Sequence, residues 1–229
     1  MSIKSKIKNN RAMVKMINFS YRLFGKNKIK IAKGNTAKIN GIINGANILV
    51  KGSGNVVEIV NPKAIKDLKI FINGNNNVIR IEEGCFLNGL IAWIEDNNCK
   101  IAVDKNTMIC GQTQLSCIEG CTISIGKDCM FSSGIYVSTG DSHSILNEKG
   151  ERINPSLDIT LKDHVWVGYH ATILKGAKIE KDSIVGARAV VTKSFDKQGV
   201  VLAGSPAKVV KENINWDKER LPLEGEHGK

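Results

Sequence analysis

The sequence predicts an all-β protein: a parallel β-helix with a basic N-terminal helix and a short C-terminal tail. Three observations support this prediction: a 22-residue repeat in the first half of the chain, a six-residue repeat in the second half, and 22 Gly with only 5% aromatic residues. Many glycines and few aromatics suit a fold of tight turns more than a large aromatic core. The 229 residues divide into an N-terminal segment 1–27, a coil 28–211 with an extruded loop 144–160, and a tail 212–229.

Positive charge is concentrated in the N-terminal part of the chain. Residues 1–57 contain 12 Lys and Arg and no Asp or Glu, so the remaining 172 residues carry 21 basic and 22 acidic side chains. A spacing of three and four predicts a basic amphipathic helix. The apolar residues with this spacing are Ile3, Ile7, Val14, Ile17, Tyr21 and Phe24.

This predicted helix has two alternative binding surfaces. It can lie on an anionic membrane surface as a peripheral contact through residues 1–27, or it can pack on the coil end or on a neighbouring subunit. Packing is favoured because an open coil end leaves unpaired strand edges that need covering. Nucleic acid is not an expected partner, because the segment lacks interleaved aromatics and a known reader motif.

Apolar i, i+2 pairs recur every 22 residues from position 57, and each predicts a short strand with one buried face. These pairs are Val57/Ile59, Ile79/Ile81, Ile101/Val103 and Ile123/Ile125. Within each unit, apolar residues also recur at every sixth position. These positions are Ile59, Ile65, Phe71; Ile81, Leu87, Trp93; Val103, Ile109, Leu115; and Ile125, Phe131, Val137. The next sixth positions are Asn77, Cys99, Cys121 and His143.

The C-terminal half keeps the six-residue step without interruption. Its consecutive sixth positions are Leu161, Val167, Ile173, Ile179, Val185 and Val191. No α-helix has a period of six, whereas a coil with three short strands per turn points every sixth side chain inward. The repeats therefore predict a three-sided prism with a stacked aliphatic interior.

The cysteines indicate neither a disulfide scaffold nor a zinc site. The sequence has no C-x-x-C pair, no run of about 18 apolar residues and no signal-peptide core, so we expect a cytoplasmic chain. In that setting we interpret all six as small core residues: Cys85, Cys99, Cys110, Cys117, Cys121 and Cys129.

Segment 161–211 begins L-K-D-H-V-W-V-G-Y-H-A-T-I-L-K-G-A and ends A-G-S-P-A-K-V-V-K. It resembles the hexapeptide-repeat acyltransferase family. With I-S-I-G-K-D-C-M, G-D-S-H-S-I and N-E-K-G-E-R-I-N upstream, the chain is most similar to bacterial polysialic acid and capsular polysaccharide O-acetyltransferases. The resemblance implies a left-handed coil, acetyl-CoA as donor and a sugar of a surface polysaccharide as acceptor, sialic acid being one candidate.

His143 stands where a polar stretch with Gly150 and Pro155 breaks the repeat. An imidazole with a pKa of about 6.5 can accept a proton from an alcohol near neutral pH. Position alone leaves a histidine that merely fills a coil corner as an equal alternative, and the resemblance implies a catalytic base. Asp141, two residues earlier, either orients the imidazole or simply forms a turn, and a carboxylate from elsewhere can serve instead.

Trp166 precedes the inward Val167, so its side chain is expected to point out of the coil. It is either a surface cap or part of a cleft. The resemblance implies that it lines the acetyl-CoA tunnel, where its indole N–H can stabilise negative charge on the reacting carbonyl. His164 and His170 are expected to be cleft or surface residues and not bases.

The edge of the coil is expected to hold the donor. Strand-edge groups at Gly168, Gly186 and Ala187 can pair with pantetheine amides, and basic residues of the last turns can meet the phosphates. For each lysine, a solvated surface charge is the alternative. The candidate phosphate-end residues are Arg188, Lys193, Lys208 and Lys211, with Ser205 in the G-S-P-A-K loop.

The expected reaction is direct attack of a sugar hydroxyl on the acetyl thioester, with His143 as general base and no acyl-enzyme. Ser142 and Ser144 flank His143 but would project to the opposite strand face. No metal is expected, since the histidines lack a ligand spacing. The alternatives are N-acetylation of a nucleotide-linked or lipid-linked amino sugar and a non-catalytic scaffold. A homotrimer is expected, because family active sites lie between subunits and a lone prism exposes apolar sides.

Overall fold

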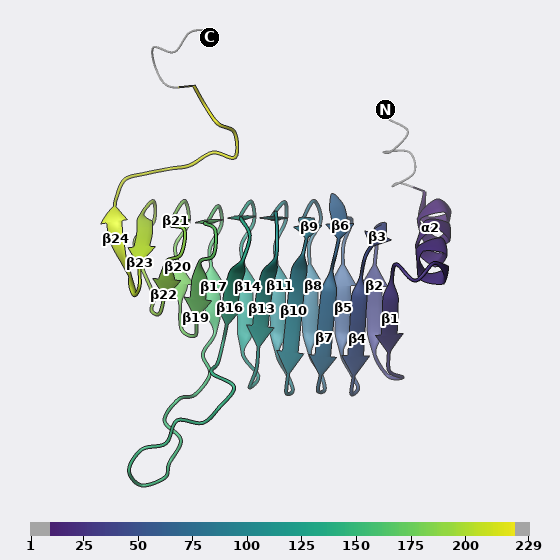
Figure 1. Ribbon diagram of the computed structural model, residues 1–229, viewed down its shortest axis with the longest axis horizontal. Helices are drawn as coiled ribbons and strands as arrows, with labels where there is room; N and C mark the ends of the chain where they lie inside the picture. The colour runs from purple at the N-terminus through teal and green to yellow at the C-terminus, as the bar shows by residue number, and fades with distance from the viewer. Residues whose placement is uncertain (1–9, 223–229) are drawn as a thin grey trace.

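The computed structural model describes residues 10–222 and has an all-β architecture, a left-handed parallel β-helix with one helix at its N-terminal end (Figure 1). The helix is α2 (Arg11–Leu23). The strands stack into three walls of a prism, and each wall takes one strand from each turn of the coil. The fold predicted from the repeats is confirmed.

The three walls are named by their number of strands. The eight-stranded wall contains β1 (Lys28–Ile31), β4 (Asn47–Lys51), β7 (Lys69–Asn73), β10 (Leu90–Glu95), β13 (Thr113–Cys117), β16 (Ile135–Ser138), β19 (Thr172–Leu174) and β22 (Val190–Val191). The seven-stranded wall contains β2 (Thr36–Ile39), β5 (Val56–Ile59), β8 (Val78–Ile81), β11 (Lys100–Val103), β14 (Thr122–Ile125), β17 (Ile159–Leu161) and β20 (Lys178–Ile179).

The nine-stranded wall contains β3 (Ile43–Asn44), β6 (Ala64–Lys66), β9 (Phe86–Asn88), β12 (Met108–Ile109), β15 (Met130–Phe131), β18 (Trp166–Val167), β21 (Ile184–Val185), β23 (Val201–Gly204) and β24 (Ala207–Lys211). All its strands are parallel except β24, which pairs antiparallel with β23 and ends the coil.

The 22-residue repeat is the register of the seven-stranded wall. Val57 pairs with Ile79, Ile79 with Ile101, and Ile101 with Ile123, and all four side chains are buried. The uninterrupted six-residue column of the second half, from 161 to 191, is buried throughout. The apolar periodicity therefore located the core correctly on these strands.

The six-residue step was wrong for Phe71 and Trp93. Both side chains lie on the outer surface of the eight-stranded wall, where their rings stack with centroids 4.2 Å apart. The buried positions on these strands are their neighbours, such as Ile70 and Ile72 on β7. The repeat is not constant along this wall: Trp93 pairs with Phe71 at a spacing of 22 residues, but Ala92 pairs with the buried Leu115 at a spacing of 23. A fixed step therefore reaches the inward column on β13 and the outward one on β7 and β10.

One cysteine departs from the prediction: Cys110 is exposed, whereas the other five are buried. Burial raises the pKa of the Cys85 and Cys121 thiols to about 11 and that of Cys129 to about 12, which keeps them protonated at neutral pH. Within residues 10–222, no group of three or more potential ligands is placed to hold a metal ion. In the same part of the chain, no helix is long and apolar enough to cross a membrane.

Asparagines stack at the corner between the eight- and seven-stranded walls. The Asn55 amide nitrogen donates to Oδ1 of Asn35 (2.8 Å), and the Asn77 amide nitrogen donates to Oδ1 of Asn55 (3.0 Å). Oδ1 of Asn77 accepts the backbone N–H of Cys99 (2.8 Å). These buried amides satisfy backbone groups that the bend leaves without a strand partner.

Helix α2 packs on the first turn of the coil, as the favoured alternative predicted. Asn10 caps it, accepting the backbone N–H groups of residues 12 and 13. The Asn18 side chain donates to the carbonyl of Gly41 (2.9 Å) and accepts the N–H of Ile43 (2.9 Å). Val14 is buried, but Phe24, predicted to share its stripe, is 80% exposed because it follows the last helical residue. Ile3 and Ile7 lie outside the described residues.

Candidate active site

His143 lies on a long loop that leaves the coil between β16 and β17, and Figure 1 shows this loop extending away from the prism. The loop folds back on itself, with Leu146 and Arg152 forming an antiparallel bridge. Ile159 and Thr160, predicted to end the loop, are instead the first residues of β17. The loop therefore occupies the interval between Ser138 and Ile159.

His143 does not continue the buried column of Asn77, Cys99 and Cys121. It is exposed, and within residues 10–222 its ring has no hydrogen-bond partner. The coil resumes where the loop returns, with the N–H of Leu157 donating to the carbonyl of Thr139 (2.9 Å). The insertion thus expels the imidazole from the prism, and the ring is accessible to a substrate.

Asn154 fixes the backbone of His143. It is a buried loop residue whose amide nitrogen donates both to the His143 carbonyl (2.8 Å) and to the Asp141 carboxylate (2.8 Å). Its Oδ1 accepts the N–H of Ile145 (2.8 Å). Sequence analysis missed this role, although Asn154 is the last residue of the quoted segment N-E-K-G-E-R-I-N.

Asp141 does not contact the His143 ring, so its predicted direct orienting contact is not found in the described protomer. Its carboxylate is hydrogen-bonded to Asn154 and forms an ion pair with Lys175. The Lys175 hydrogen bond is the main cause that lowers the pKa of the Asp141 carboxyl, followed by the bond from Asn154. Asp141 can therefore act on His143 only through Asn154 and the backbone.

A second ion pair anchors the returning strand of the loop. The guanidinium of Arg152 pairs with the carboxylate of Glu119, which also accepts the backbone N–H of Ser156 (3.2 Å). The Arg152 hydrogen bond is the largest cause that lowers the pKa of Glu119 to about 2. The loop is thus tied to the preceding turn of the coil.

Trp166 on β18 points outward, as predicted, between the buried Val165 and Val167. Its ring lies 6.0 Å from that of Trp216. Trp216 stacks on His164 at 4.2 Å and donates its indole N–H to the His164 carbonyl (2.8 Å). The C-terminal segment therefore covers part of the Trp166 surroundings, a contact that nothing in the tail sequence indicated.

The other two histidines of the region occupy turns. His164 Nδ1 pairs with Asp182 at 3.0 Å, and the exposed His170 makes an edge contact with Tyr169. Both have positive φ, near 56°. These contacts fit the prediction that neither is the base.

A single protomer does not bring His143 and Trp166 together. His143 follows β16 of the eight-stranded wall, whereas Trp166 belongs to β18 of the nine-stranded wall. The seven-stranded wall lies between these two positions in the course of one turn. Within residues 10–222 of one chain, the two candidate residues therefore belong to different walls.

Gly168 and Gly186 occupy equivalent corners of successive turns. A Cβ on Gly168 would lie 2.7 Å from the backbone nitrogen of Ala187, so only glycine fits there. The N–H groups of Gly168 and Gly186 donate to the carbonyls of Val185 (2.8 Å) and Leu202 (2.7 Å). The coil thus already uses these two N–H groups, and the predicted pairing of this strand edge with pantetheine amides stays a prediction for its other groups.

The predicted phosphate-end residues lie at the C-terminal end of the coil and are all exposed. Ser205 stands in the turn between β23 and β24, before the cis peptide bond to Pro206. The Lys193 ammonium lies 5.6 Å from the ring centroid of Phe195. Exposed positive charges on the last turns are available to an anionic donor end. Its members are Arg188, Lys193, Lys208 and Lys211.

Comparisons with known proteins agree with this architecture. No family model matches the chain. A polysialic acid O-acetyltransferase of Neisseria meningitidis is 37% identical over 93 residues, which are 40% of this chain and 43% of that protein. The alignment thus spans less than half the length of this curated relative.

Two solved structures are similar over most of the coil. The polysialic acid O-acetyltransferase OatWY has a TM-score of 0.69 at 33% identity, covering 86% of this chain and 90% of that chain. The polySia-specific acetyltransferase NeuO has a TM-score of 0.62 at 29% identity, covering 77% and 92%.

The coil, its loop and these similarities define a left-handed β-helix of the acyltransferase type. The chain belongs to the hexapeptide-repeat acyltransferase family, the family of the polysialic acid O-acetyltransferases to which it is similar. The resemblance inferred from the sequence motifs is confirmed.

Proposed function

We propose that this protein is an acetyl-CoA-dependent O-acetyltransferase that modifies a sugar hydroxyl of a bacterial capsule or surface polysaccharide, with polysialic acid as the first acceptor to test. The similarity to a solved polysialic acid O-acetyltransferase over 86% of the chain carries this proposal. The exposed imidazole at the root of the loop supplies the chemistry.

His143 is the general base. Its neutral imidazole takes the proton of the sugar hydroxyl as the hydroxyl oxygen attacks the thioester carbonyl carbon. A carbon–oxygen bond forms, the carbon–sulfur bond breaks, and the thiolate leaves with the electron pair of that bond. The bonds of Asn154 to the His143 carbonyl and to the N–H of Ile145 hold the base in place while its ring stays free to meet the acceptor.

Residues near β18 and at the C-terminal end of the coil bind the donor. Trp166 provides an apolar surface beside the acyl group, and its indole N–H is available to the developing oxyanion. The four exposed basic residues of the last turns match the phosphates of acetyl-CoA. The N–H groups of Gly168 and Gly186 are occupied, and each of their carbonyls accepts one backbone N–H, so we assign pantetheine contacts to the second lone pair of these carbonyls and to Ala187.

A complete site requires two subunits. His143 and Trp166 lie on different walls, so the cleft between neighbouring coils of a homotrimer unites the base of one with the tryptophan of the other. The loop also exposes Ile145, Leu146 and Ile153, whose side chains are more than half accessible in the protomer. A neighbouring coil is the surface that would cover them.

The function is tested by following free thiol release from acetyl-CoA with polysialic acid, free sialic acid and amino sugars as acceptors. We expect release with a hydroxyl acceptor. His143→Asn should lower turnover at least about 100-fold, because the base is lost while the loop anchors remain. His170→Asn is the matched control and should keep near wild-type turnover.

Three other outcomes would contradict the proposal. Release with amino sugars alone would establish the N-acetyltransferase alternative. No thiol release with any acceptor would favour a non-catalytic scaffold, whether or not the protein binds acetyl-CoA. Near wild-type turnover in His143→Asn would move the base to another residue.

A further inference from the structure

Helix α2 has a second apolar face that sequence analysis did not detect. Met16, Phe19 and Leu23 follow a spacing of three and four and are 65%, 62% and 68% exposed. They point away from the coil, because the opposite face of the helix, with Val14, packs on the first turn. Figure 1 shows α2 as the outermost described element at this end of the prism.

Exposed large apolar side chains on one helical face mark an interaction surface. The coil does not need this face, since Val14 and the Asn18 hydrogen bonds already fasten the helix. The surface is therefore available to a partner outside the protomer.

The charge around this face indicates the chemistry of that partner. The first 57 residues carry 12 Lys and Arg and no acidic side chain. Lys15 is exposed in the first half of the helix and Lys26 shortly after its end, and Lys28 and Lys30 are exposed on β1, the next element. An apolar face surrounded by uncompensated positive charge is complementary to a bilayer with anionic lipids.

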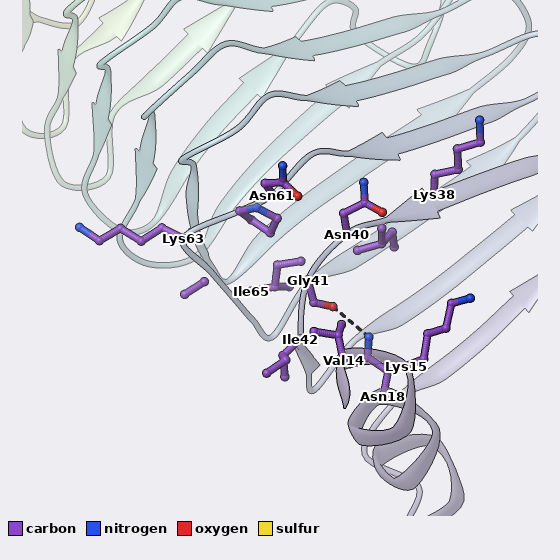
Figure 2. A pocket seen from close by; sticks show the side chains of 13 residues that line it. Val14, Lys15, Asn18, Lys38, Asn40, Gly41, Ile42, Asn61, Lys63 and Ile65 are labelled. Carbon is purple, nitrogen blue, oxygen red and sulfur yellow. Dashed lines mark hydrogen bonds between the residues drawn. The ribbon is translucent and has the colours of Figure 1, made fainter. Parts of the chain in front are cut away.

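A cavity of about 760 Å³ lies at the junction of α2 with the coil, on the coil-facing side of the helix. Figure 2 shows Val14, Lys15 and Asn18 on its helical side and Lys38 and Asn40 on the coil. Lys15 precedes Phe19 by four residues, so the cavity rim and the apolar face are neighbours on the helix surface. Ammonium and amide groups at the rim suit the phosphate of a lipid headgroup.

We infer that the N-terminal end of the coil docks on an anionic membrane surface, with Met16, Phe19 and Leu23 entering the headgroup region and the surrounding lysines meeting lipid phosphates. A second copy of the chain is the less suitable occupant. End-to-end contact would bring two such basic surfaces together with no acidic partner in residues 1–57 of either chain.

The test is sedimentation of the full-length protein with vesicles of phosphatidylcholine containing phosphatidylglycerol, compared with vesicles of phosphatidylcholine alone. We expect binding to the anionic vesicles only, and release when salt is raised from about 0.1 M to 1 M, because the Debye length falls from about 10 to 3 Å. Replacing Met16, Phe19 and Leu23 together by Ser should weaken binding at least about 100-fold.

Two further variants separate the charge from the fold. Lys15→Glu with Lys38→Glu should weaken binding at least about 25-fold, since each lysine near the surface contributes a factor of roughly five. Lys162→Glu with Lys181→Glu, at exposed positions on the C-terminal half of the coil, changes the net charge by the same amount and should bind vesicles like wild type. Circular dichroism spectra identical to wild type show that the apolar variant is folded.

Three outcomes would overturn the inference: equal binding to both kinds of vesicle, unchanged binding of the folded Ser variant, or a drop in particle mass without vesicles when the Ser variant replaces wild type. The last result would assign the face to a second copy. The vesicle assay does not depend on acetyl transfer, so its result is independent of the proposed function.

Discussion

Asn154 stabilises the candidate base without touching its ring. It bonds to the His143 carbonyl, to the N–H of Ile145 and to the Asp141 carboxylate, which also pairs with Lys175. A buried amide that makes three such bonds is costly to replace, because its partners would lose their hydrogen bonds inside the protein. The imidazole can then vary its contacts with substrate while its position on the loop stays fixed.

The ion pair at Glu119 makes the loop anchor sensitive to acid. The pKa of the Glu119 carboxyl in the folded protein is about 2, below its ordinary value of 4.5. The ion pair therefore stabilises the fold fully above the pKa of the unfolded state, and this stabilisation is lost as the pH falls from there towards the pKa of the folded state. We predict that Glu119→Gln lowers the thermal unfolding midpoint at about pH 6 and that the difference from wild type narrows towards about pH 3. Differential scanning fluorimetry across this range measures both.

Glu148→Gln is the control, because Glu148 is an exposed loop carboxylate with no ion pair among the described residues. Its midpoint should follow that of wild type at every pH. A Glu119→Gln deficit that stays constant down to about pH 3 would contradict the prediction.

Helix α2 acts as an end cap for the coil through side-chain amides. Asn18 and Asn27 each donate to a carbonyl and accept a backbone N–H of the first corner, as a further turn of strand would do. The amides thus protect an edge that would otherwise be open to pairing with other chains. At the opposite end, the antiparallel β24 closes the nine-stranded wall.

We predict that Asn27→Ala lowers the free energy of unfolding by about 1–3 kcal/mol. The substitution leaves the carbonyl of Ile43 and the N–H of Ala46 without partners at a buried position. Urea unfolding followed by circular dichroism measures the loss. Asn47→Ala, at an exposed position on β4, should change the value by no more than about 0.5 kcal/mol. Equal losses in the two variants would refute the capping role.

The arrangement of the prism suggests how the assembled enzyme works. His143 and Trp166 belong to different walls, and the loop that carries the exposed apolar residues extends away from the coil. The apolar face of α2 is at the N-terminal end, away from both. Catalysis between coils and docking at one end can therefore coexist.

For the assembly, we predict a mass of about 75 kDa in light scattering, three times the 25.0 kDa of the chain. Replacing Ile145 and Leu146 by Asp should shift the mass towards the monomer and lower turnover, because charged side chains would be buried at the contact. Glu148→Gln should leave the mass unchanged. A fully active 25.0 kDa species would disprove the shared site.

Local patterns were sufficient to predict the coil, its three walls and the outward position of Trp166. Apolar periodicity is a property of neighbouring residues, and in a coil every turn repeats the same burial, so a sequence read alone reveals it. The motifs around His143 and in segment 161–211 likewise predicted the loop and the family.

Contacts between distant residues were beyond such patterns. The outward position of Phe71 and Trp93, the partner of Asp141 and the packing of Trp216 on His164 depend on which segments meet in space. These contacts are determined by strand length, side-chain length and the path of the loop. Local residue spacing does not predict these contacts, because the two partners lie one or more turns of the coil apart along the chain.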